Sequence, residues 1–214
     1  MKRYALPLSL VGFIALVFVL VAFSGKATSP YANGGAKEVV VANEWVRGNA
    51  SSTVTLVEYS DFQCPACRAY AGMIKQLESE FGGKIAFIYR NFPLYQIHPN
   101  ADLAARAAES AGRQGKFWEM HDVLFDRQDV WAKLLNPTGK FVEYATELGL
   151  NAEQFKKDIE NDEIAKSIAD DYQSGTKIGV TGTPTFVLNG VKIPRNPDSI
   201  DAFRAILSAA TFGK

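Results

Sequence analysis

The order of hydrophobic and polar positions predicts a strand, a helix and a second strand in the first half of the chain. Residues 53–60 are dense in β-branched and aromatic side chains, which is typical of a buried strand. From residue 64 to residue 81 the apolar positions recur at spacings of three and four, and Gly82 and Gly83 follow as a stop. Residues 85–89 have the composition of another buried strand. This order predicts a βαβ unit with parallel strands.

The pattern then becomes helical, and it stays so from residue 99 to residue 178. Helical segments are expected from about residue 100, around residues 117–124, and over residues 141–148, 151–159 and 163–172. Gly149 closes one of these helices and Asn151 opens the next, as their preferences for helix ends indicate. We therefore expect an all-α block inserted between two stretches of strand pattern.

Strand character returns near the C-terminus. Residues 184–188 read as a strand, and Asn189-Gly190 is a strong signal for a tight hairpin into a strand at residues 191–194. Asp198 is expected to cap a last amphipathic helix. At the other end, residues 39–41 are expected to form a first short strand.

The N-terminus has the pattern of a membrane-targeting segment. Lys2 and Arg3 precede 22 residues without a charge, residues 4–25, which as a helix would span about 33 Å. This length favours a retained transmembrane anchor over a cleaved signal peptide, although cleavage after Ala27 is an alternative. The positive charges place the N-terminus in the cytoplasm and the body outside it. Residues 28–37 are small and polar, as in a flexible tether.

Charge argues against a nucleic-acid partner. Lys and Arg together number 23, as do Asp and Glu. Without Lys2, Arg3 and Lys26 the remaining chain has 20 basic and 23 acidic residues, which is too even a balance to attract a polyanion.

Two cysteines, Cys64 and Cys67, stand between the first predicted strand and its helix. A CxxC pair in a βαβ pattern is typical of redox chemistry. A structural disulfide would close a very short loop, and a zinc site would need further ligands, whereas His98 and His121 are unpaired and distant in sequence; we therefore expect no metal. At the helix N-terminus Cys64 should be the thiolate nucleophile, with Cys67 as its more buried resolving partner.

Three sequence stretches carry a family resemblance. These are VEYSDFQCPAC at residues 57–67, HPNADLAARAAESAG at residues 98–112 and GVTGTPTFVLNG at residues 179–190. They resemble the DsbA-like family of thiol:disulfide oxidoreductases. The resemblance implies an α/β thioredoxin fold with an inserted all-α helical subdomain, preceded here by one transmembrane helix. The expected parts are the anchor (1–27), the tether (28–37), the first part of the core (38–98), the insertion (99–178) and the second part of the core (179–214).

The resemblance also implies roles for residues away from the cysteines. Thr183 and a cis Pro184 would face the disulfide and bind substrate. Glu58 matches the family's buried acid and would relay a proton for Cys67, the alternative being an ordinary strand carboxylate. Phe62 would line an apolar groove for substrate, together with Phe92 and Tyr95, although aromatic side chains beside strands are usually part of the core.

We therefore expect a membrane-anchored, extracytoplasmic enzyme with no cofactor beyond its redox-active disulfide. Its partners would be reduced or unfolded exported proteins and a membrane redox protein that resets the pair. Ala66 departs from the family pattern, because strong oxidases of this family usually have a histidine there. The expected direction is disulfide donation; a reductase or isomerase, or a redox-inactive chaperone or peptide-binding module, remain as alternatives.

Overall fold

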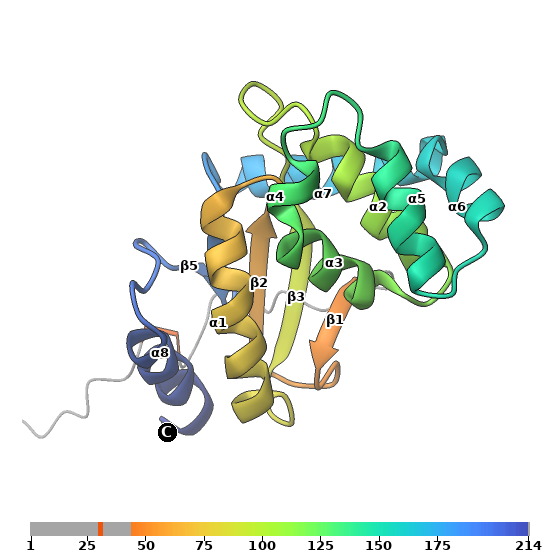
Figure 1. Cartoon of the computed structure of the whole chain (residues 1–214). Helices are drawn as coiled ribbons and strands as arrows, with labels where there is room; N and C mark the ends of the chain where they lie inside the picture. Colours follow the sequence, from red (N-terminus) through yellow and green to blue (C-terminus); the bar gives the residue numbers. More distant parts are fainter. Residues whose placement is uncertain (1–29, 32–43, 214) are drawn as a thin grey trace, which may run out of the picture.

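A computed structural model describes residues 30–31 and 44–213 of the chain, which form an α/β structure with helices on both faces of one sheet (Figure 1). The anchor expected over residues 4–25 and the strand expected at residues 39–41 lie outside these residues. Within the part that is described, no helix is both long and apolar enough to cross a membrane.

The sheet has five strands in the order β1-β3-β2-β4-β5. Their bounds are β1 Trp45–Gly48, β2 Thr55–Ser60, β3 Ala86–Asn91, β4 Thr185–Leu188 and β5 Val191–Lys192. β2 and β3 are parallel, and every other neighbouring pair is antiparallel. The predicted βαβ unit is thus confirmed, and β2, the central strand, leads directly to the cysteines. β1 was not foreseen, and it adds an antiparallel edge next to β3.

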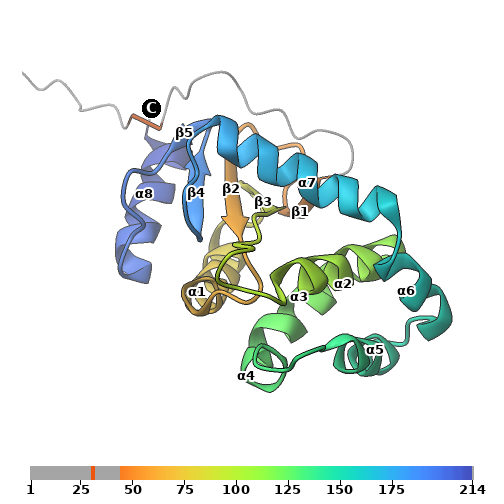
Figure 2. The same ribbon diagram turned by 90° about the horizontal axis from the view of Figure 1, so that it is seen from above.

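Helix α1 (Pro65–Phe81) joins β2 to β3 and covers one face of the sheet. Its Leu77 and Phe81 pack with Phe203 and Leu207 of the C-terminal helix α8 (Ile200–Phe212), so both helices share that face. The opposite face is covered by α7 (Asp162–Lys177), as the view from above shows (Figure 2). The cysteines therefore lie at the end of a sheet that is covered on both sides.

The inserted block is helical, as predicted. Its helices are α2 Ala101–Arg113, α3 Phe117–Asp126, α4 Gln128–Trp131, α5 Thr138–Glu147, α6 Ala152–Ile159 and α7. Gly149 has a φ of 76°, which a closing glycine allows, and the Asn151 side chain accepts a hydrogen bond from the Gln154 amide at the start of α6. The four-residue helix α4 was not predicted. It lies beside the N-terminal end of α1 (Figure 1).

The C-terminal hairpin also agrees with the sequence pattern. Asn189 and Gly190 both have positive φ, at 51° and 78°, as a two-residue hairpin turn requires. One detail is corrected: the cap of α8 is Ser199, whose hydroxyl accepts from the Ala202 amide at 3.3 Å, and not the neighbouring Asp198. Both residue types are good caps, and the register of the helix selects between them.

Candidate active site

Cys64 and Cys67 lie at the first turn of α1. Cys64 is its N-cap residue, with φ of −72° and ψ of 122°, and Pro65 follows at the first helical position, where a missing N–H costs nothing. The Cys64 amide donates to the Asp61 carbonyl at 3.0 Å, which closes the turn after β2. Both cysteines are free thiols, and Cys67 is fully buried.

The surroundings of the two thiols separate their acidities. The Cys67 thiol, above all, lowers the pKa of Cys64 to about 5 by hydrogen bonding; burial opposes this, and the N–H groups of Cys67 and Ala66 reinforce it. Burial raises the pKa of Cys67, and the neighbouring Cys64 raises it further. The geometry thus suits Cys64 to act as the exchanging thiolate and Cys67 to remain a protonated partner.

The loop before β4 reaches the Cys64 sulfur. The Thr183-Pro184 peptide bond is cis, as expected, and Cys64 Sγ lies 3.5 Å from the Thr183 carbonyl oxygen. The Thr183 hydroxyl is buried and has no hydrogen-bond partner among the described residues. Because it can donate to a thiolate, this hydroxyl also lowers the pKa of Cys64. The structure thus brings Thr183, 119 residues away in sequence, to the nucleophile.

Glu58 is buried in β2, beneath the cysteines. Burial is the main cause that raises the pKa of its carboxyl group to about 7; a hydrogen bond from Ser60 Oγ, 2.7 Å from Glu58 Oε1, opposes this, and the Cys64 charge adds to it. Glu58 in turn raises the pKa of Cys67. The Glu58 carboxyl group therefore gains and loses its proton near neutral pH. It also lies close enough to Cys67 to influence that thiol electrostatically.

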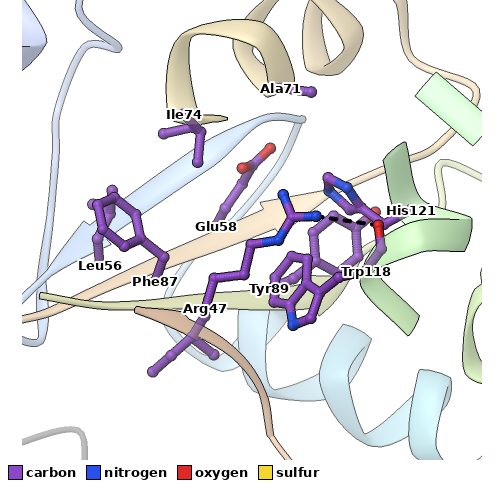
Figure 3. A pocket seen from close by; sticks show the side chains of 10 residues that line it. Arg47, Leu56, Glu58, Ala71, Ile74, Phe87, Tyr89, Trp118 and His121 are labelled. Carbon is purple, nitrogen blue, oxygen red and sulfur yellow. Dashed lines mark hydrogen bonds between the residues drawn. The ribbon is translucent and has the colours of Figure 1, made fainter. Parts of the chain in front are cut away.

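A cavity of about 20 Å³, enough for one water molecule, lies beside Glu58 (Figure 3). Tyr89 of β3, His121 of α3 and Arg47 of β1 also line it. The Tyr89 hydroxyl is buried with no hydrogen-bond partner in the described structure, and burial lowers the pKa of His121. Neither Tyr89 nor Arg47 could be foreseen from the sequence, because nothing in the local pattern links them to the cysteines.

Phe62 does not line a groove, so this expectation is corrected. Its ring is 1% exposed and lies 5.0 Å from the rings of both Tyr89 and Phe125, measured between centroids. The inserted helix α3 covers it, which leaves no free ring face for a substrate. Phe92 is buried as well, and only Tyr95 of the three aromatic residues is exposed.

Asp61 holds the segment before Cys64 in place. Its carboxylate accepts from the Gln63 amide at 2.7 Å, the Leu94 amide at 2.9 Å and His98 Nδ1 at 2.7 Å. His98 thus has a structural partner. Among the described residues no group of three or more His, Cys, Asp or Glu side chains could hold a metal ion.

Known proteins are similar to this chain in sequence and in fold. A sequence model described as thioredoxin matches residues 41–209. A Na(+)/H(+) antiporter NhaA 1 of Mycolicibacterium vanbaalenii is 36% identical over 165 residues, which are 75% of this chain but only 26% of that relative. The chain thus spans about a quarter of the length of the curated relatives that it matches.

Solved structures resemble the chain over most of their length. A thioredoxin-like oxidoreductase from Silicibacter pomeroyi is 30% identical with a TM-score of 0.67, covering 79% of this chain and 93% of that one. The thiol-disulfide exchange protein α-DsbA2 from Wolbachia pipientis shares the fold at 22% identity, with a TM-score of 0.67 and coverage of 78% and 87%. The chain therefore belongs to the thioredoxin family, and it shares its fold with a DsbA-like thiol-disulfide exchange protein.

Proposed function

We propose that the chain donates disulfides to reduced or unfolded exported proteins through Cys64 and Cys67. The observation that carries this proposal is the separation of the two thiol pKa values, lowered to about 5 for Cys64 and raised for Cys67. A stabilised Cys64 thiolate favours the reduced enzyme, and an enzyme that prefers its reduced form is an oxidant.

In this reaction a substrate thiolate attacks Cys64 Sγ of the enzyme disulfide. The Cys64–Cys67 bond breaks, a mixed disulfide forms, and Cys67 leaves as a thiolate that takes up a proton, for which Glu58 is the nearby acid. A second substrate thiolate then attacks the substrate sulfur of the mixed disulfide, and Cys64 leaves as a thiolate. Two electrons pass from the substrate dithiol to the enzyme, and a membrane redox partner takes them away.

The size of the Cys64 shift supports an oxidant of intermediate strength. With a Cys64 pKa of about 5, the thiolate form of Cys64 outnumbers the thiol form about a hundredfold at pH 7. Since each tenfold change is worth about 30 mV in a two-electron couple, ionisation raises the potential by at most about 60 mV. Ala66 supplies no further charge. We therefore place the chain between reductant-like thioredoxins and the strongest oxidases.

Apolar side chains near Cys64 support a polypeptide substrate. The Asn100 side chain donates to the carbonyls of Ala132 and Leu134, so the loop after α4 lies next to the segment that precedes α2. Large hydrophobic side chains are exposed on α4 and on these two segments, namely Tyr95, Ile97, Val130, Leu134 and Leu135. Exposed apolar groups around a reactive thiol suit segments of an unfolded chain better than a small polar thiol.

The proposed location is the cell membrane, with residues 4–25 as a single span, the N-terminus in the cytoplasm and the catalytic domain outside. Carbonate extraction of membranes and the intact mass of the purified chain test this proposal. Recovery of a soluble species that begins near Thr28 would refute the anchor and leave the export proposal standing.

Equilibration with glutathione buffers, scored by thiol trapping, together with oxidation of a reduced two-cysteine peptide, tests the activity. Disulfide donation predicts a potential above about −260 mV and rapid peptide oxidation. A lower potential with fast reduction of a peptide disulfide would favour the reductase alternative. Binding of unfolded chains by the Cys64→Ser, Cys67→Ser double variant, with no exchange by the wild-type protein, would favour a chaperone.

A further inference from the structure

Two glutamine side chains connect the inserted helices to the Cys64 segment in opposite directions. Gln63, just before Cys64, donates through Nε2 to the Ala132 carbonyl at 2.7 Å and accepts from the Asn100 amide at 2.7 Å. Gln128, the first residue of α4, donates through Nε2 to the Phe62 carbonyl at 2.7 Å and the Cys64 carbonyl at 3.0 Å. Each glutamine therefore binds the backbone of the other part of the molecule.

Gln128 is buried, with 4% of its surface exposed. A buried amide is costly unless it is hydrogen-bonded, and this amide satisfies two carbonyls on either side of residue 63. The cross-link spans 64 residues of sequence between Gln128 and Cys64. Gln128 belongs to helix α4, which has only four residues, and a pattern this short cannot be recognised as a helix from the sequence.

The Cys64 carbonyl is the point where this contact bears on chemistry. It also accepts the first-turn hydrogen bond of α1, from the Arg68 amide at 3.2 Å. Two further N–H groups of that turn, from Ala66 and Cys67, stabilise the Cys64 thiolate. The alignment of the sulfur with these N–H groups depends on the orientation of the Cys64 backbone, which Asp61 fixes at the amide and Gln128 fixes at the carbonyl.

We propose that Gln128 is a positioning residue through which the inserted helices set the reactivity of Cys64. The inference rests on the proposed redox function of the cysteine pair. It assigns the insertion a role in tuning the disulfide, beyond covering the core. Gln63 anchors the same segment to the insertion but does not bind the Cys64 carbonyl, so it provides a matched control.

The test compares Gln128→Met with Gln63→Met, because methionine has about the same length and no hydrogen-bond donor. The pH profile of Cys64 alkylation and the equilibrium with glutathione are measured for both. For Gln128→Met we expect the profile to move to higher pH and the equilibrium to shift about fivefold toward the disulfide, which corresponds to about 20 mV. For Gln63→Met we expect a shift below twofold.

A role that is only structural would lower the melting temperature of Gln128→Met and leave its potential unchanged, and this outcome would overturn the proposal. Equal shifts in both variants would overturn it as well, since docking in general would then be responsible. If Gln128→Met does not fold, Gln128→Leu, which also removes the donor and adds no charge, decides by the same criterion. A wild-type protein that does not equilibrate with glutathione refutes the proposed function, whereas a redox-active wild type with unmoved Gln128 variants refutes only this inference.

Discussion

The sulfur of Cys64 lies 3.5 Å from the carbonyl oxygen of Thr183, so two segments 119 residues apart form one site. The carbonyl can accept a hydrogen bond from the thiol, while the Thr183 hydroxyl acts on the thiolate and lowers the pKa of Cys64. Thr183 thus interacts with both the thiol and the thiolate form of Cys64. Because Ala66 carries no charge, this hydroxyl is one of the few side-chain groups that favour the thiolate.

Replacing Thr183 with valine should make the pair less oxidising. We expect Thr183→Val to raise the pKa of Cys64 by about half a unit to one unit, which lowers the potential by about 15 to 30 mV. Stability should be unchanged or slightly higher, because the hydroxyl is buried without a partner. The alkylation profile, the glutathione equilibrium and thermal unfolding check this. Thr146→Val, at an exposed position in α5, is the control, and an unchanged Cys64 profile in Thr183→Val would contradict the assignment.

Alkylation should distinguish the two cysteines sharply. The pKa of Cys64 is lowered to about 5 and that of Cys67 is raised, so at pH 6 only Cys64 has an appreciable thiolate fraction. We expect iodoacetamide to label Cys64 at least a hundredfold faster, as peptide mass spectrometry would measure. The Cys64→Ser variant controls for access to Cys67. Comparable rates at both positions would show that the nucleophile is misassigned.

Local sequence patterns were enough to predict the elements of the core, but they did not predict the contacts between the core and the inserted helices. The β2, α1 and β3 elements each have a clear period or composition, and the cysteines sit between two of them. β1 has four residues and ends in Gly48, so it offers too little pattern. Its Trp45 stacks on Phe117 of α3 with ring centroids 4.3 Å apart, a contact that local sequence does not encode.

The same limit applies within the site. Glu58 could be placed because strand periodicity and its distance from Cys64 fix where it lies. The position of Phe62 could not be predicted, because a single aromatic residue after a strand can line a groove or belong to the core. Only the packing of α3 against the sheet determines that Phe62 belongs to the core. Gln128 and Tyr89 act through contacts between distant segments, so no spacing along the chain predicts them.

Gly112 should be intolerant of substitution because α2 packs closely against β1 there. A Cβ atom at Gly112 would lie only 2.2 Å from the Trp45 ring, whereas one at Gly139 in α5 would meet nothing within 4 Å. We expect Gly112→Ala to lower the free energy of unfolding by about 1 to 3 kcal/mol, despite the better helix propensity of alanine. Gly139→Ala, as the matched control, should raise it by up to about 1 kcal/mol. Urea unfolding measures both, and a stable Gly112→Ala variant would contradict the close contact.

Glu58 should make the fold less stable as pH rises. Burial raises the pKa of its carboxyl group to about 7, from 4.5 in an unfolded chain. The folded state therefore binds a proton more tightly, and the stability this provides is complete below about pH 4.5 and lost as pH rises through about 7. Glu58→Gln cannot ionise, so between pH 5 and pH 8 the wild-type protein should lose about 2.5 kcal/mol relative to this variant. Urea unfolding of the oxidised proteins measures the difference, with Glu160→Gln, at an exposed position, as the control. Parallel pH profiles for the wild type and Glu58→Gln would show that Glu58 is ionised throughout, and the proton uptake by Cys67 would then need another donor.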